Sequence, residues 1–222
     1  MEYAGINNIL LGDFFTLRFG QTQAGDLNIV SQILAVSQAE YDKKGFKACC
    51  KVAHPIFEYI QKAPKWSDVE LAALSCVIGY HANYGITMEL FQEILDILDS
   101  REAKYEQIRT ALHYNFTHRL NRAICFDIKP TEIAKQKIAS DLFYESYQHV
   151  MAVCEQSELL PRKYVLQVRR GIFENDAKLI DEGLVGLSKL GANELYRSTK
   201  NEIEEYLLNI TNDSCAGTLC AF

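Results

Sequence analysis

Residues that interrupt helices are scarce in this chain. Only four prolines occur among 222 residues. No segment alternates apolar and polar residues with the two-residue period of a half-buried strand, and no Asn-Gly or Asp-Gly pair marks a tight hairpin. These absences argue against a fold built on sheets and favour one built on helices.

Long apolar runs are lacking as well. The short run at residues 9–11 has no basic segment before it and is followed by Asp13, so it is a poor signal peptide. No stretch approaches the ~20 apolar residues that a membrane span needs. We therefore expect a cytoplasmic protein that makes no membrane contact.

Clustered positive charge is also missing. Acidic residues outnumber basic ones by 29 to 23, which gives a net charge of -6. A nucleic-acid surface needs grouped Lys and Arg. The adjacent basic residues, Arg162-Lys163 and Arg169-Arg170, are too few for such a surface, and we expect them to be solvated.

Motifs for catalysis or metal binding are absent from the sequence. None of the seven cysteines has C-x-x-C spacing, and there is no P-loop, H-E-x-x-H or G-x-S-x-G motif. We expect reduced thiols in a core, and we predict no catalytic residue, metal or cofactor. One alternative is an enzyme that uses Cys125 with His113 or His118, although Cys125 falls on a face expected to be buried.

Apolar residues do recur every three or four positions, which is the period of a helix. Ser67, with Glu70 three positions later, predicts a capping box, and Pro161 predicts another helix start. Gly191 predicts a helix end. The predicted helices cover residues 27–41, 46–60, 67–84, 87–98, 104–126, 130–153, 161–173, 179–190 and 194–208.

Short links between these helices require neighbours to pack antiparallel. Such hairpins cannot bury their apolar faces in separate pairs, so they stack into a solenoid. The unit at residues 161–193 is close to the ~34-residue length of a tetratricopeptide repeat (TPR). We predict an all-α fold, a right-handed α-solenoid of TPR-like antiparallel helix hairpins, with one domain over residues 1–211 and a flexible tail over 212–222.

The helix predicted at 104–126 carries polar side chains at spacings of three and four, which places them on one face. Asparagine can donate and accept toward a peptide backbone, and arginine offers a fork for a carboxylate. We predict that these residues, with two from an earlier helix end, bind a peptide on the concave face; the alternative is a solvated outer face. The predicted peptide-binding residues are Asn115, His118, Arg119, Arg122, Asn83 and Tyr84.

Three segments resemble the Rgg/GadR/MutR family of transcriptional regulators. Residues 65–71, Lys-Trp-Ser-Asp-Val-Glu-Leu, are similar to the W-x-x-x-E-L segment of that family. Residues 112–124 resemble its Asn-containing helix, and residues 164–207 resemble its C-terminal end. The resemblance covers most of the chain from about Phe14.

In that family an N-terminal helix-turn-helix domain binds promoter DNA, and a C-terminal TPR-like domain dimerises and binds short intracellular pheromone peptides. No helix-turn-helix sequence precedes Phe14 here. The resemblance therefore implies a quorum-sensing regulator's peptide sensor, which contacts DNA only through a helix-turn-helix domain not present in this chain. The alternative is a TPR-like scaffold that docks another protein without a peptide ligand.

Three apolar residues on the last predicted helix have no later helix to cover them: Ile203, Tyr206 and Leu207. An uncovered terminal repeat either carries a polar cap or pairs with another surface. We therefore predict a homodimer that forms through these residues.

Overall fold

The computed structural model describes residues 24–63, 65–101, 105–129, 131–154 and 159–218, with side chains placed between residues 29 and 207. This part of the chain forms nine α-helices, a 3-10 turn and a π-helical turn, without a strand, so the all-α prediction is confirmed. The elements are α2 (Ala24–Tyr41), α3 (Phe46–Gln61), α4 (Asp68–Val77), η1 (Ile78–Tyr80), α5 (Tyr84–Asp99), α6 (Glu106–Arg122), η3 (Ala123–Asp127), α7 (Ile133–Cys154), α8 (Leu160–Glu174), α9 (Ala177–Lys189) and α10 (Asn193–Thr218). Within the same residues, none of the helices combines the length and apolar character required to span a bilayer.

Local start and stop signals act where the sequence predicts them. The Ser67 side chain accepts from the Glu70 amide and the Glu70 carboxylate accepts from the Ser67 amide, which completes the capping box of α4. Asn175 ends α8 in the left-handed conformation, and Asp176 then caps α9. Gly191, with φ of 66°, ends α9 as predicted.

Two element boundaries differ from the prediction. Asn83 does not end a helix; its side chain accepts from the Ile86 amide and caps the start of α5. The last helix continues to Thr218, so the tail predicted at 212–222 begins inside a helix over its described residues.

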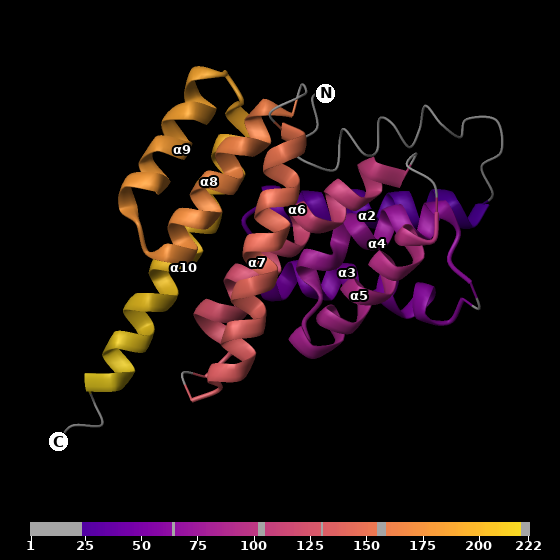
Figure 1. The fold of residues 1–222 in the computed structure, drawn as a ribbon, viewed down its shortest axis with the longest axis horizontal. Helices are drawn as coiled ribbons and strands as arrows, with labels where there is room; N and C mark the ends of the chain where they lie inside the picture. Colours follow the sequence, from indigo (N-terminus) through magenta and orange to yellow (C-terminus); the bar gives the residue numbers. More distant parts are fainter. Residues whose placement is uncertain (1–23, 64, 102–104, 130, 155–158, 219–222) are drawn as a thin grey trace.

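The helices form a series in which alternate members pack together. α2 contacts α4, α4 contacts α6, α6 contacts α8, and α8 contacts α10. Each of α3, α5, α7 and α9 packs against one or two members of this row, as Figure 1 shows for the α8–α9 hairpin. α6 lies at the centre, in contact with α4, α5, α7 and α8.

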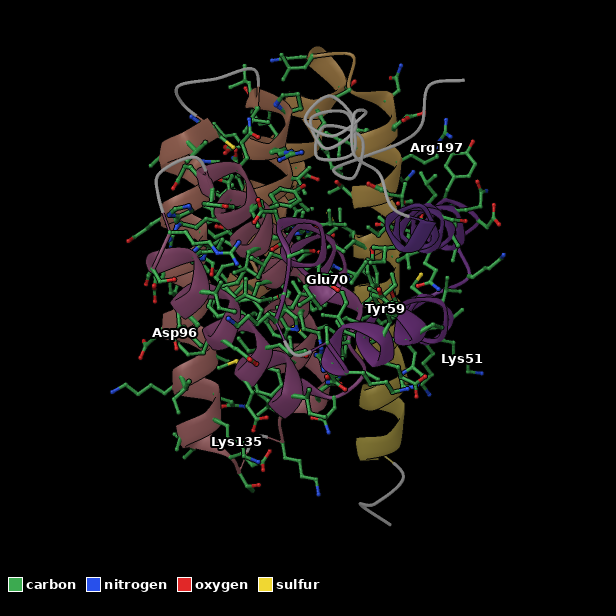
Figure 2. All side chains as sticks on the ribbon, turned by 90° about the vertical axis from the view of Figure 1, so that its right-hand side faces the viewer. Lys51, Tyr59, Glu70, Asp96, Lys135 and Arg197 are labelled. Atoms are coloured by element: carbon green, nitrogen blue, oxygen red, sulfur yellow. The ribbon has the colours of Figure 1, made fainter. Side chains whose placement is uncertain are left out.

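The two ends of this row approach each other. Arg197 of α10 donates a hydrogen bond of 3.1 Å to the Tyr41 hydroxyl at the end of α2. The Phe46 amide at the start of α3 donates to Glu205, also on α10, at 3.3 Å. Figure 2 shows Arg197 beside the indigo helix α2, with α10 in yellow behind it. α10 therefore lies beside the end of α2 and the start of α3.

Candidate functional site

The polar face predicted on α6 is buried rather than open. Arg119 is 0% exposed and Asn115 is 7% exposed, because four other helices surround α6. The expectation of a solvent-facing polar surface at these two positions is therefore wrong. A buried polar side chain is stable only when other groups satisfy its hydrogen bonds.

All three guanidinium nitrogens of Arg119 contact other groups of the protein. Its Nε and Nη2 donate to the carbonyl oxygens of His81 and Ala82, at 3.0 and 3.3 Å. Its Nη1 lies 2.6 Å from the Asp127 carboxylate. The guanidinium thus ties the link before α5 to the π-helical turn after α6, and its fork is already occupied.

Three more of the predicted peptide-binding residues have internal contacts. Asn115 donates to the Ser75 carbonyl at 2.9 Å and joins α6 to α4. Asn83 caps α5, and the Tyr84 ring packs against the Arg119 guanidinium, whose carbon lies 5.5 Å from the ring centroid. These contacts hold the helices together.

His118 and Arg122 extend from α6 toward α10. The Nδ1 of His118 is 3.1 Å from Glu202, and Nη1 of Arg122 donates to Glu205 at 2.9 Å. The guanidinium carbon of Arg122 also lies over the Phe46 ring, 3.8 Å from its centroid. The structure therefore brings these two predicted residues together at the inner side of α10.

A cleft lies beside His118, between α2, η1 and α10. It has a main part of about 310 Å³ and a smaller part of about 40 Å³. Its walls come from α2, the start of α3, η1, α6 and α10, which are far apart in the sequence. The residues that line both parts are Glu40, Tyr80, His118, Ser198 and Asn201.

A buried ion pair forms the floor of the cleft. Arg169 of α8 binds Glu202 with Nε at 3.1 Å and donates from Nη1 to the Tyr114 carbonyl at 2.7 Å. Burial alone raises the pKa of Glu202, but the charges of Arg169 and His118 outweigh it and lower that pKa to about 2. Arg169 is 5% exposed and Arg162 is 4% exposed, so the solvated surface predicted for them is wrong.

Glu40 lies in the last turn of α2 and lines both parts of the cleft. Its carboxylate is partly buried, accepts a hydrogen bond from the Tyr80 hydroxyl, and forms no ion pair with any residue that the structure describes. Burial raises its pKa, while His118 and Tyr80 only partly oppose that effect. Glu40 therefore has no direct ion-pair partner among the described residues, although His118 and Arg169 act on its carboxyl from nearby.

Cys125 and His113 of the alternative enzyme are largely removed from water, whereas His118 faces Glu202. Burial raises the pKa of the Cys125 thiol to about 11, so little thiolate forms at neutral pH. His113 contacts Ser146 at 3.0 Å, and burial lowers its pKa to about 3. Among the described residues, no group of three His, Cys, Asp or Glu is placed to hold a metal ion.

The predicted dimer residues differ in exposure. Ile203 is buried against Val168 and Ile172 in one apolar cluster, and Tyr206 packs beside it. Leu207 is 54% exposed. Of the three predicted dimer residues, Leu207 is therefore the one with a largely exposed side chain.

Sequence reasoning did not find the α2 and α10 walls of the cleft. The signal on α10 is a run of polar residues at spacings of three and four, which also suits a solvated helix face. Glu40 gives no signal of its own. The polar residues of α10 that line the cleft are Glu194, Arg197, Ser198, Asn201, Glu202, Glu204 and Glu205.

No family model, curated protein or solved structure matches the chain. The resemblance to the Rgg/GadR/MutR regulators therefore stays a prediction from the sequence.

Proposed function

We propose that the chain is the sensor and dimerisation domain of an Rgg-like transcriptional regulator, and that it binds a short signalling peptide in the cleft. The observation that carries the proposal is a cleft of about 310 Å³ that the first and last described helices enclose. Its polar and aromatic walls suit a peptide, which offers backbone hydrogen bonds and side chains together. In this proposal contact with DNA belongs to a helix-turn-helix domain, as in that family.

The order of helix contacts supports a TPR-like right-handed solenoid within this proposal. In such stacks one helix of each hairpin packs on its counterparts in neighbouring hairpins and forms the inner, concave row. The series α2, α4, α6, α8 and α10 fits that row. The cleft then lies on the concave side, where helical solenoids bind their partners.

The size of the cleft indicates how a peptide enters. A volume of about 310 Å³ is at the lower end of ligand pockets, which span about 300–1,000 Å³. A whole peptide needs more room than this, so we expect α10 to move away from α2 when a peptide binds. Its contacts with α2 and the start of α3 include the exposed pair of Lys43 and Glu204, 3.6 Å apart, and such pairs contribute only ~0–1 kcal/mol.

Affinity selection from a library of synthetic linear peptides tests the proposal. The Ser198→Tyr variant fills the cleft, because Ser198 lines both of its parts. The matched control is Ser188→Tyr, at an exposed serine of α9. We expect wild type and the control to retain the same peptides and Ser198→Tyr to lose them. A library from which wild type retains nothing contradicts the proposal.

The second candidate is a scaffold that docks a protein without a peptide. The internal use of Asn115 and Arg119 favours it, because it removes two of the groups predicted to grip a peptide. A monomer that binds a protein partner with the cleft filled by Ser198→Tyr would support the scaffold.

A further inference from the structure

We propose that the cleft binds a cationic amine of its occupant at the carboxylate of Glu40, beside the ring of Tyr80. The site is a feature of the cleft itself. The proposed function enters only where the source of the amine is named. If the occupant is a peptide, the amine is the N-terminal ammonium or a lysine side chain of that peptide.

Most of the other carboxylates around the cleft already have cations. Arg169 and His118 bind Glu202, Lys43 lies 3.6 Å from Glu204, and Arg122 donates to Glu205 at 2.9 Å. Glu194 lies in the first turn of α10, where the helix dipole favours an acidic group. Glu40 accepts from the Tyr80 hydroxyl and forms no ion pair with a described residue; His118 and Arg169, which bind Glu202, lower its pKa only in part.

The position of Glu40 in its helix adds to the negative potential. Glu40 lies in the last turn of α2, which contains no basic residue. The C-terminal end of a helix carries partial negative charge and stabilises cations. A carboxylate at this end, partly removed from water, is stabilised by any cation that enters the cleft.

Aromatic rings provide the walls beside the carboxylate. The Tyr80 and Phe46 rings lie 6.3 Å apart and line the main part of the cleft, while Tyr41 lines the smaller part. Ring faces attract ammonium groups. Tyr41 and Phe46 already contact cations, because the guanidinium carbons of Arg197 and Arg122 lie 5.5 and 3.8 Å from their ring centroids. Tyr80 is therefore the ring beside Glu40 that an incoming ammonium would meet.

The chemistry favours an amine over other ions. A metal such as Ca²⁺ needs six or more oxygen ligands, and the described residues bring no three His, Cys, Asp or Glu together for a metal. An anion is repelled by Glu40. An ammonium group needs only one carboxylate, a hydrogen-bond acceptor and an aromatic surface. Glu40 provides the carboxylate, and Tyr80 provides both a hydroxyl oxygen and a ring.

The test is an NMR titration of the ¹⁵N-labelled full chain with n-butylammonium, and with n-butanol as the neutral control. We expect saturable shifts of amides near Glu40, Tyr80 and His118 with the amine alone. In Glu40→Gln the amine affinity should fall at least about tenfold. In Glu58→Gln, at an exposed carboxylate of α3 outside the cleft, it should stay within about twofold of wild type.

Three outcomes overturn the amine site: no saturable response in wild type, an equal response to n-butanol, or full affinity in a folded Glu40→Gln protein. Acetylation of the N-terminus and lysines of library-selected peptides separates this inference from the proposed function. Peptides that bind equally well after acetylation overturn the amine site and leave peptide sensing standing. If wild type binds n-butylammonium but retains no peptide, peptide sensing is overturned and the amine site stands.

Discussion

Charged side chains in the interior make this protein's stability depend on pH. Glu202 has a folded-state pKa of about 2 against an ordinary value of 4.5, because the charges of Arg169 and His118 outweigh burial. A carboxyl with a depressed pKa stabilises the folded state above its unfolded pKa, and this stabilisation is lost as the pH falls. The contribution of Glu202 is therefore complete above about pH 5 and disappears between about pH 4.5 and pH 2.

Loss of the Arg169 guanidinium should be strongly destabilising at neutral pH. In Arg169→Met the Glu202 carboxylate stays buried without its main partner, and we expect the free energy of unfolding to fall by ~3–5 kcal/mol. Urea denaturation measures the change. The matched control is Arg170→Met, which breaks an exposed pair with Glu174 and should cost at most ~1 kcal/mol. Equal losses in the two variants would disprove the role of burial.

Removal of the Glu40 charge should stabilise the folded protein, whereas loss of the Arg169 charge should destabilise it. Burial raises the pKa of Glu40, so its ionised form costs stability at high pH, and protonation removes that cost as the pH falls. Glu40→Gln should raise the melting temperature at pH 8, with a smaller gain at pH 5. His118, Tyr80, Glu202 and Arg169 also act on this carboxyl, so the melting temperature is compared with wild type at each pH. A lower melting temperature of the variant at pH 8 would contradict the account.

At the scale of elements, apolar periodicity and caps predict most of the helices, because these signals are local. The burial of α6 could not be predicted in the same way. Asn115 and Arg119 donate to carbonyls of residues about 40 positions earlier in the chain, and a carbonyl acceptor has no signature in the sequence. A polar side chain satisfied in this way has the same sequence pattern as a solvated one.

The α8–α9 hairpin depends on a close helix approach at Gly186. A Cβ added there would overlap the Tyr164 ring. Gly186→Ala should therefore lower the free energy of unfolding by ~1–3 kcal/mol, although alanine is the better helix former. Chemical denaturation measures the loss. Val185→Ala, at a neighbouring residue that is 49% exposed, should change stability by no more than ~0.5 kcal/mol. A Gly186→Ala protein as stable as wild type would refute this packing.

At the scale of the whole molecule, the meeting of α2 and α10 creates the cleft. The Tyr41–Arg197 contact joins residues 156 positions apart. Curvature of a helical stack follows from small rotations between successive hairpins, and sequence periodicity does not encode those rotations. For this reason the sequence predicts a binding face but not the cleft walls on α2 and α10.

A homodimer stays a prediction at this scale, and Leu207 is its best-placed residue. The C-terminal part of α10 extends beyond the α8–α9 hairpin in the view of Figure 1, and Leu207 is 54% exposed. A modest interface has a dissociation constant of about 10⁻⁵ M. Sedimentation of the protein at tens of micromolar, which is about that concentration, should therefore show a dimer. Leu207→Asp should shift it toward a monomer without loss of helical content. A wild-type monomer at that concentration would contradict the prediction.

Calorimetric titration of one library-selected peptide into three proteins tests the central claim, that the cleft between α2, η1 and α10 is the ligand site. Wild type and Ser188→Tyr should bind with dissociation constants within about twofold of each other, and Ser198→Tyr should bind at least about tenfold more weakly. Equal affinity of all three folded proteins would place the ligand elsewhere and contradict the account.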